Sequence, residues 1–393
     1  MIIAIDIREA VRQKKAGKGW YTHQIVENLL KEYPEDTFLL YTDQPYPEWE
    51  HYPNAQQRFF PPSPLRWHFK VLKDLKKERP DIYFAPSSYI IPSFAPKWLN
   101  VVATVHDLVA WLFATRHNMK ATIIERMTLP LAVRNITKFI TVSKNTKRDL
   151  QHFFSVPSEK IQVIPCGAGQ QFRQMSTEEG EKFRHEKKLP EKFILAVGTL
   201  EPRKNFTILI RAFAQLVKKY PEYSLVIVGG RGWYFEKIFD TVRKLEVEDS
   251  VKFAGYVNDE DLPGYYNTAE CLIFPSLYEG FGIPLLEAMK SGCPVITSNI
   301  SSMPEVVGDA AILVNPSSPE ELREAMEKII TSPELASELR EKGLKQSEKF
   351  SWKSSAKELH QLFEGLLGPL SKSHKKATIG PWKKLFTKCT SGR

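Results

Sequence analysis

The chain has 393 residues, of which 42% are hydrophobic and 26% are charged, a composition typical of folded globular proteins. Its length exceeds that of one typical domain and predicts two hydrophobic cores. The net charge of +9 is localised, because residues 369–393 hold seven Lys or Arg and no acid. Removing these seven from the 55 basic residues leaves 48 against 46 acidic residues, so the body of the chain shows no nucleic-acid-binding charge.

No apolar run reaches the roughly 18 residues expected of a membrane-spanning helix, and the chain begins directly with a strand-like segment. Neither a signal peptide nor a membrane span is therefore predicted. The four cysteines form no close pair, which favours a reduced, cytoplasmic setting without a cysteine metal site: Cys166, Cys271, Cys293 and Cys389.

Apolar strand-like runs alternate with helix-like segments over residues 1–172. This alternation predicts a parallel sheet covered by helices on both faces, whose ligands bind beyond the carboxyl ends of the strands. The predicted strands begin near residues 2, 37, 81, 101, 138 and 160.

The same pattern restarts at Phe193 after a polar interval, which predicts a second domain of the same class over residues 173–350. Its predicted strands begin near residues 193, 224, 251, 270, 294 and 310. Residues 319–348 show helical spacing of Leu, Glu and Lys. A last helix is expected over 351–368, with Ser351 as its N-cap, before a basic and mobile tail over 369–393.

Two loops of the first domain lie where ligands are expected. After the first strand, Gly17 and Gly19 precede a helix and favour either a flexible loop or a turn that cradles a ligand. His106 ends a later strand, where an imidazole either caps the strand or donates to a sugar oxygen and transfers protons.

In the second domain, Arg203 and Lys204 follow a strand and precede a helix. Paired cations at this position are suited to neutralising phosphate, although a solvated surface pair is an equal alternative.

A strand, a glycine loop and a helix start follow one another over residues 270–305. Gly280 and Gly282 allow close approach to the backbone, and a helix N-terminus attracts an anion such as a diphosphate. Glu279 and Glu287 instead suit hydroxyl groups. A nucleotide-sugar combines both chemistries, whereas the plainer interpretation is an ordinary turn with acids at a helix start.

Together these segments resemble glycosyltransferase family 4 over residues 1–367. The most specific part is the pair Glu279 and Glu287, which matches the family's E-x7-E motif within SLYEGFGIPLLEAMKSGCPVITSN. The segments VGTLEPRKN, GYVNDEDLPGYY, SSMPEV and FSW resemble its mannosyltransferase-like branch.

The resemblance implies an α/β fold of two Rossmann-like domains (GT-B), with the acceptor mainly on the first, the nucleotide-sugar mainly on the second, and a final helix that crosses back to the first domain. It implies a retaining hexosyltransferase that needs no metal or other cofactor and takes a nucleotide diphosphate sugar, with GDP-mannose as the first hypothesis. A glycan or lipid-linked acceptor and a role in cell-surface polysaccharide or glycolipid synthesis are expected.

Residue roles follow from the same resemblance. Glu279 is expected near the sugar hydroxyls and Glu287 at the ribose. The implied catalytic set is His106, Arg203, Lys204 and Glu279; the implied donor-binding set is Gly17, Gly19, Gly280, Phe281, Gly282 and Glu287.

Two positions depart from the family pattern. Thr199 stands where the family commonly has arginine, so Arg203 is expected to supply that charge from another backbone position. Cys166 stands where asparagine is common before the glycine.

Residues 65–79 form a basic amphipathic segment that either lies on an anionic membrane, at the inner face of the cell membrane, or is an ordinary helix with a solvated charged face. Trp382, Leu385 and Phe386 of the tail are expected to add to such contact. Two rival hypotheses for the whole chain are a non-catalytic nucleotide-sugar-binding scaffold and a sugar-nucleotide epimerase or phosphorylase on the same fold.

Overall fold

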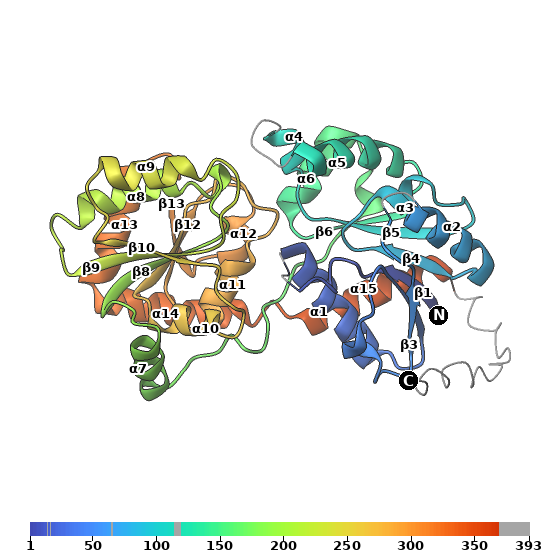
Figure 1. Ribbon diagram of the computed structural model, residues 1–393, viewed down its shortest axis with the longest axis horizontal. Helices are drawn as coiled ribbons and strands as arrows, with labels where there is room; N and C mark the ends of the chain where they lie inside the picture. Colours follow the sequence, from blue (N-terminus) through green and yellow to red (C-terminus); the bar gives the residue numbers. More distant parts are fainter. Residues whose placement is uncertain (14, 16, 64–65, 114–118, 369–393) are drawn as a thin grey trace, which may run out of the picture.

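A computed structural model describes residues 1–13, 15, 17–63, 66–113 and 119–368, and the predicted basic tail lies outside this range. Two α/β lobes lie side by side in Figure 1. Each contains one parallel sheet, which confirms the predicted fold class.

The first sheet has seven strands in the order β3-β2-β1-β4-β5-β6-β7, all parallel. Its strands are β1 (Ile2–Asp6), β2 (Thr37–Thr42), β3 (Ala55–Phe59), β4 (Ile82–Ala85), β5 (Asn100–Val105), β6 (Lys138–Thr141) and β7 (Ile161–Val163). Its helices are α1 (Gly17–Glu32), α2 (Arg66–Glu78), α3 (Ile90–Ser93), α4 (Val109–Leu112), α5 (Met119–Ala132) and α6 (Lys144–Phe154), with short 3-10 turns η1 (Pro47–Trp49) and η2 (Ser158–Lys160).

The second sheet has six parallel strands in the order β10-β9-β8-β11-β12-β13. They are β8 (Lys192–Val197), β9 (Tyr223–Val228), β10 (Val251–Gly255), β11 (Cys271–Phe274), β12 (Val295–Ser298) and β13 (Ala311–Val314). The helices of this lobe are α7 (Thr177–Glu186), α8 (Phe206–Leu216), α9 (Glu236–Lys244), α10 (Leu262–Thr268), α11 (Ile283–Lys290), α12 (Met303–Val307), α13 (Pro319–Thr331) and α14 (Pro333–Ser347), with η3 (Pro202–Lys204), and the chain continues into α15 (Trp352–Leu367).

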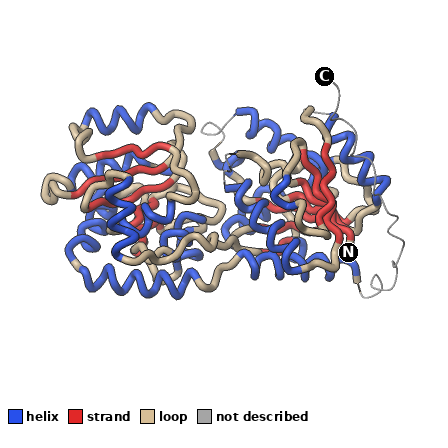
Figure 2. Tube along the Cα trace, turned by 60° about the horizontal axis from the view of Figure 1, so that its bottom comes forward, coloured by secondary structure: helices blue, strands red, loops and turns tan. Residues whose placement is uncertain are grey.

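Helices cover both faces of the first sheet, as the alternation of strand and helix predicts (Figure 2). Side chains of β4 alternate between two cores. Tyr83 packs with Trp67 of α2 and Leu129 of α5, whereas Phe84 packs with Leu29 of α1 and Phe363 of α15. Helices α2, α3, α5 and α6 therefore form one layer over the sheet, and α1 and α15 form the other.

Helix α15 returns from the second lobe to pack against α1, which confirms the predicted crossover (Figure 1). Ser351 caps it by accepting a hydrogen bond from the backbone N–H of Ser354, as predicted. The His360 ring stacks on Tyr33, and its Nε2–H donates to Asp36 Oδ2 over 2.6 Å. This buried bond fastens α15 to the first lobe.

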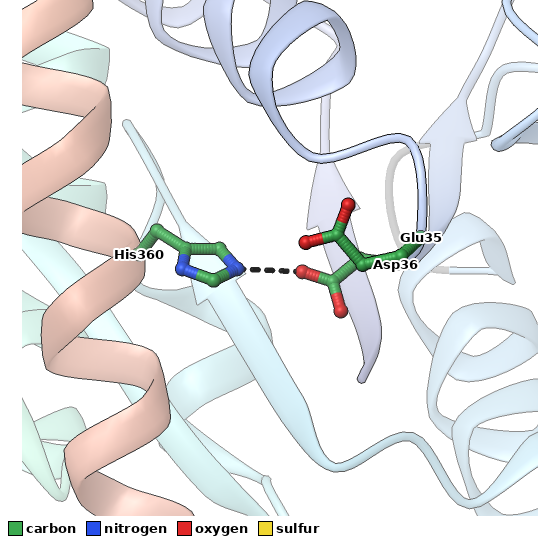
Figure 3. Close-up of side chains that lie close together, drawn as sticks. All are labelled: Glu35, Asp36 and His360. Atoms are coloured by element: carbon green, nitrogen blue, oxygen red, sulfur yellow. Dashed lines mark hydrogen bonds and ion pairs between the residues drawn. The ribbon is translucent and has the colours of Figure 1, made fainter.

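Figure 3 shows Glu35 beside the bonded pair of Asp36 and His360. The three side chains offer ligand atoms within 4.8 Å of one another, the kind of grouping that can hold a metal. Asp36 already accepts from His360 and, on its other oxygen, from the amino group of Met1. Both carboxylate oxygens therefore have partners, so we interpret the group as a structural fastening.

Candidate functional site

The loop after β8 presents Arg203 and Lys204 at the carboxyl edge of the second sheet. Residues 202–204 form the 3-10 turn η3, and Asn205 adopts a left-handed conformation at φ 62° before α8 begins. The Asn205 side-chain amide donates to the carbonyls of Pro275 (3.1 Å) and Pro316 (2.6 Å). These two bonds fix the cation-bearing loop to the segments that follow β11 and β13.

Both cations contact one carboxylate, that of Glu279. Lys204 Nζ lies 2.6 Å from Oε1 and Arg203 Nη1 lies 2.7 Å from Oε2. Arg203 Nη2 also lies 2.6 Å from Glu201, so two cations and two carboxylates balance. The structure thus brings three of the four predicted catalytic residues into one buried cluster.

The electrostatics of this cluster follow from burial and charge. Burial alone would raise the pKa of Glu279, but Arg203 and Lys204 outweigh it and the pKa lies below its ordinary value. Burial lowers the pKa of Lys204 despite the neighbouring Glu279. The ion pair between Lys204 and Glu279 could not be predicted from sequence periodicity, because the two residues are 75 positions apart.

The glycine turn before α11 brings the two lobes into contact. Gly282 caps the helix at φ 108°, a conformation that favours glycine. A Cβ on Gly280 would lie 1.8 Å from the carbonyl oxygen of His106, so only glycine permits this approach between the lobes. The Phe281 ring is buried and packs edge-on against Phe350, so only its backbone could face a ligand.

Glu287 lies in a different environment from Glu279. It borders a small cavity of ≈40 Å³ between the lobes, whose walls include Trp20 and Trp352. Tyr266 donates a hydrogen bond to Glu287 Oε2 over 2.9 Å. Burial, with the nearby charge of Asp259, raises the pKa of Glu287 to about 7 against the effect of the Tyr266 bond. Sequence reasoning missed Tyr266 and Asp259, although both fall in the segment GYVNDEDLPGYY.

His106 reaches the site from the first lobe. Its Nε2–H donates to the Pro86 carbonyl over 2.7 Å, and the Tyr21 ring packs edge-on against the imidazole. Burial and the positive charge of Lys18 lower the pKa of His106 to about 4. The ring is therefore neutral at physiological pH, and its Nδ1 atom can accept a hydrogen bond. Because the Nε2–H already bonds to the Pro86 carbonyl, it is not free to donate to a sugar oxygen, which was one of the roles predicted from the sequence.

Gly17 and Gly19 do not form the predicted loop, because both lie in the first turn of α1. Gly17 has open space around its α-carbon, whereas a Cβ on Gly19 would lie 2.7 Å from the carbonyl oxygen of Glu9. Packing explains this difference, because glycine at position 19 lets the first turn of α1 lie against the segment that follows β1.

Further contacts between the lobes surround the Glu279 loop. The Glu305 carboxylate accepts from the backbone N–H groups of Lys144 (2.9 Å) and Asn145 (3.0 Å) at the start of α6. The Tyr278 hydroxyl donates to Asp149 Oδ2 over 2.6 Å. A carboxylate at a helix N-terminus is favourable, so Glu305 of the segment SSMPEV helps hold the lobes together.

A second cavity, of ≈290 Å³, lies in the first lobe at the carboxyl ends of β1 and β4. Glu125 of α5 enters its wall with a buried Oε1 that has no hydrogen-bond partner among the described residues. Lys18 stands near Glu125 and Asp107, and its pKa is raised by them against the effect of burial. The other lining residues are mostly polar: Asp6, Arg8, Glu9, Arg12, Ser87, Ser88, Tyr89, Ile90, Ile124 and Thr128.

Comparison with known proteins agrees with this architecture. Residues 19–169 match the family described as "Glycosyltransferase Family 4", and residues 177–346 match "Glycosyl transferases group 1". The chain is 29% identical to O-antigen chain mannosyltransferase B of Escherichia coli over 76% of each chain. It is 32% identical to the serotype-specific mannosyltransferase WbdA of the same organism over 68% of this chain, which spans only 33% of that relative's length.

Solved structures share the fold at low sequence identity. Sucrose-phosphate synthase from Thermosynechococcus elongatus superposes with a TM-score of 0.76 at 22% identity, covering 93% of this chain and 99% of that one. HepE of Anabaena, determined with UDP and glucose, gives a TM-score of 0.76 at 20% identity, covering 93% and 100% of the two chains. With both of its domains matched in order, the chain belongs to the glycosyltransferases, with a family 4 domain followed by a group 1 domain.

Proposed function

We propose that this glycosyltransferase moves a mannosyl residue from GDP-mannose to a hydroxyl of a glycan or lipid-linked acceptor, with retention, in the synthesis of a cell-surface polysaccharide or glycolipid. The observation that carries the proposal is the buried cluster of Arg203, Lys204 and Glu279 beside the contact of Gly280 with His106. Similarity to O-antigen mannosyltransferases supports mannose as the sugar.

The cluster suits a diphosphate leaving group. When the bond from the sugar C1 to the phosphate oxygen breaks, negative charge grows on that oxygen, and Arg203 and Lys204 stabilise it. Both cations are held by Glu279 in this structure. An entering diphosphate competes with Glu279 for them, and the carboxylate oxygens so released accept hydrogen bonds from sugar hydroxyls. Two fixed cations are the basis for proposing that no metal is required.

The acceptor oxygen then bonds to C1 on the face that the phosphate leaves, and its proton passes to the phosphate oxygen. This step needs no protein base. Neutral His106 accepts a hydrogen bond from a donor sugar hydroxyl at Nδ1, and ionised Glu287 accepts from the ribose. The ≈290 Å³ cavity is the proposed acceptor site, because its unpartnered Glu125 oxygen and neighbouring Lys18 suit hydroxyl groups.

Calorimetry and product analysis test the proposal. We expect GDP-mannose to bind more tightly than UDP-glucose, and GDP to appear only when an acceptor extract is added. A scaffold would bind without releasing GDP, and an epimerase would convert the sugar nucleotide without acceptor. A phosphorylase would form the sugar phosphate when inorganic phosphate is supplied. Any of these three results would overturn the transferase assignment.

Membrane contact is part of the proposal, but not through the apolar face of α2. Trp67, Val71 and Leu75 of that helix are buried in the core of the first lobe, so these three apolar side chains are not exposed to a bilayer. Trp382, Leu385 and Phe386 lie outside the described residues. Among the helices of the described part of the chain, none is long and apolar enough to cross a bilayer.

A further inference from the structure

Helix α5 has an apolar outer surface, which is unusual for a helix on the outside of a domain. Ile123, Ile124, Met127 and Leu131 are 50, 49, 66 and 48% exposed, and we name them the α5 stripe. At 3.6 residues per turn they fall within about 100° around the helix axis. Leu129, on the opposite side, is buried in the core. The stripe is therefore not needed to pack the helix onto the sheet.

Other exposed apolar side chains gather on the same layer of helices. Among the described residues, nine of the fifteen large hydrophobic side chains that are exposed lie between residues 66 and 154. Besides the stripe they are Phe69, Phe94, Trp98, Leu112 and Phe153. Helix α3 contacts both α2 and α5, so Phe94, which follows α3, and the stripe belong to neighbouring elements. A concentration of this kind marks an interaction surface.

The charge beside the stripe has one sign. The exposed polar side chains of α2 are all basic: Arg66, Lys70, Lys73, Lys76 and Lys77. Its two acids, Asp74 and Glu78, are largely buried and lie 3.8 and 3.2 Å from Arg58. Glu125, an acid of α5, faces the inner cavity. The acids described on the two helices are thus all partly buried, whereas the basic side chains of α2 are exposed.

We propose that the α2–α5 layer of the first lobe is a contact surface for an anionic bilayer, with the α5 stripe entering the lipid interface and the α2 cations facing the headgroups. Apolar side chains beside basic ones bind such membranes by burial of apolar area and attraction to anionic lipid. The α5 stripe also lies beside the proposed acceptor cavity, because Ile124 belongs to both the stripe and the cavity wall. A lipid-anchored acceptor would reach the cavity from this side, a consequence that rests on the proposed function.

Vesicle flotation of the full chain tests the surface without any nucleotide. We expect binding to vesicles of phosphatidylcholine and phosphatidylglycerol in equal amounts, and weak binding to phosphatidylcholine alone. Ile123→Ser with Met127→Ser should lower the partition coefficient about 10-fold or more. The matched control, Leu245→Ser with Ile300→Ser, changes exposed residues of the second lobe and should bind as the parent chain does.

Equal binding of the stripe variant and the parent, or no binding by the parent, would overturn the proposal. So would a concentration-dependent dimer, seen by sedimentation, that the stripe variant abolishes. A second readout does not depend on loss of binding. An environment-sensitive fluorophore on Met127→Cys, in a Cys389→Ser background, should shift to the blue with anionic vesicles, whereas the same label on Ile300→Cys should not. Since neither assay involves donor or acceptor, failure of the transferase assignment would leave both results interpretable.

Discussion

Lys204 Nζ and Glu279 Oε1 lie 2.6 Å apart, on two loops that follow different strands of the second sheet. Lys204→Met should reduce turnover by about 100-fold or more, because it removes a donor to the developing phosphate charge. It should also lower the free energy of unfolding by about 3 kcal/mol, since Glu279 would keep only one of its cations in a buried site. Steady-state kinetics and urea unfolding measure the two effects.

A double variant separates stability from catalysis. Lys204→Met with Glu279→Gln removes both charges, so most of the lost stability should return while turnover stays low. Recovery of turnover in the double variant, or full activity of Lys204→Met alone, would contradict the phosphate role.

Glu287 should make donor binding depend on pH. Its pKa of about 7 means that the carboxylate that accepts from the ribose forms as the pH rises from 6 to 8, so the donor Kd should fall over this range. Glu287→Gln should bind the donor more weakly and lose this pH dependence. Calorimetry at several pH values checks the prediction, and unchanged donor affinity in the variant would remove the ribose assignment.

The raised pKa of Glu287 should also make the free energy of unfolding decrease as the pH rises. Because the folded-state pKa is raised, the unfolded chain releases the proton first as the pH rises. The stability associated with protonated Glu287 is therefore present below its ordinary pKa of about 4.5 and is lost by about pH 7. Glu287→Gln should gain stability relative to the parent over this range and keep a constant gain above it.

His106 should stay neutral throughout the physiological range. Its pKa of about 4 and the bond from Nε2–H to the Pro86 carbonyl predict one neutral tautomer from pH 5.5 to 8. Nuclear magnetic resonance of the labelled histidines, with His106→Gln to assign the signal, tests this. Titration of His106 near pH 6.5 would show that its buried environment is not maintained in solution.

Gly280→Ala should block the contact between the lobes. Its Cβ would lie 1.8 Å from the His106 carbonyl oxygen, so turnover should fall by about 100-fold or more as the catalytic groups separate. Gly365→Ala is the matched control, because a Cβ there meets nothing within 4 Å. Small-angle scattering should show a larger radius of gyration for Gly280→Ala alone, and unchanged scattering and turnover would contradict the role of this contact.

Glu125→Gln should weaken use of the acceptor. Burial raises the pKa of Glu125 against the effect of Lys18, and one of its oxygens has no hydrogen-bond partner among the described residues. With any acceptor that supports transfer, kcat/KM should fall by roughly 10-fold or more, as expected when a buried hydrogen bond to a charged group is lost. The Kd of GDP-mannose should not change. Glu178→Gln, on the exposed surface of α7, serves as control.

Strands and helices depend mainly on local sequence, which explains why most of the strands were predicted correctly. Apolar runs such as IIAIDI and FILAVGTL are long enough to be buried on both faces of a parallel sheet, and β1 and β8 form there. Strand β3 was missed because AQQRF at positions 55–59 is an edge strand, half-exposed and polar. Backbone hydrogen bonds pair it with β2, and such bonds leave no pattern of apolar residues in the sequence.

The two-lobed α/β architecture and the loops at the carboxyl ends of the strands follow from the amino-acid sequence, because periodicity is a local property, and the family follows from the resemblance of short motifs. Three features could be found only in the folded chain: Glu279 holds both Arg203 and Lys204, the pKa of His106 is lowered, and α5 turns apolar side chains outward. Charge pairing and burial depend on distances between segments far apart in the chain. Those distances are set when the sheets, the helical layers and the two lobes pack together.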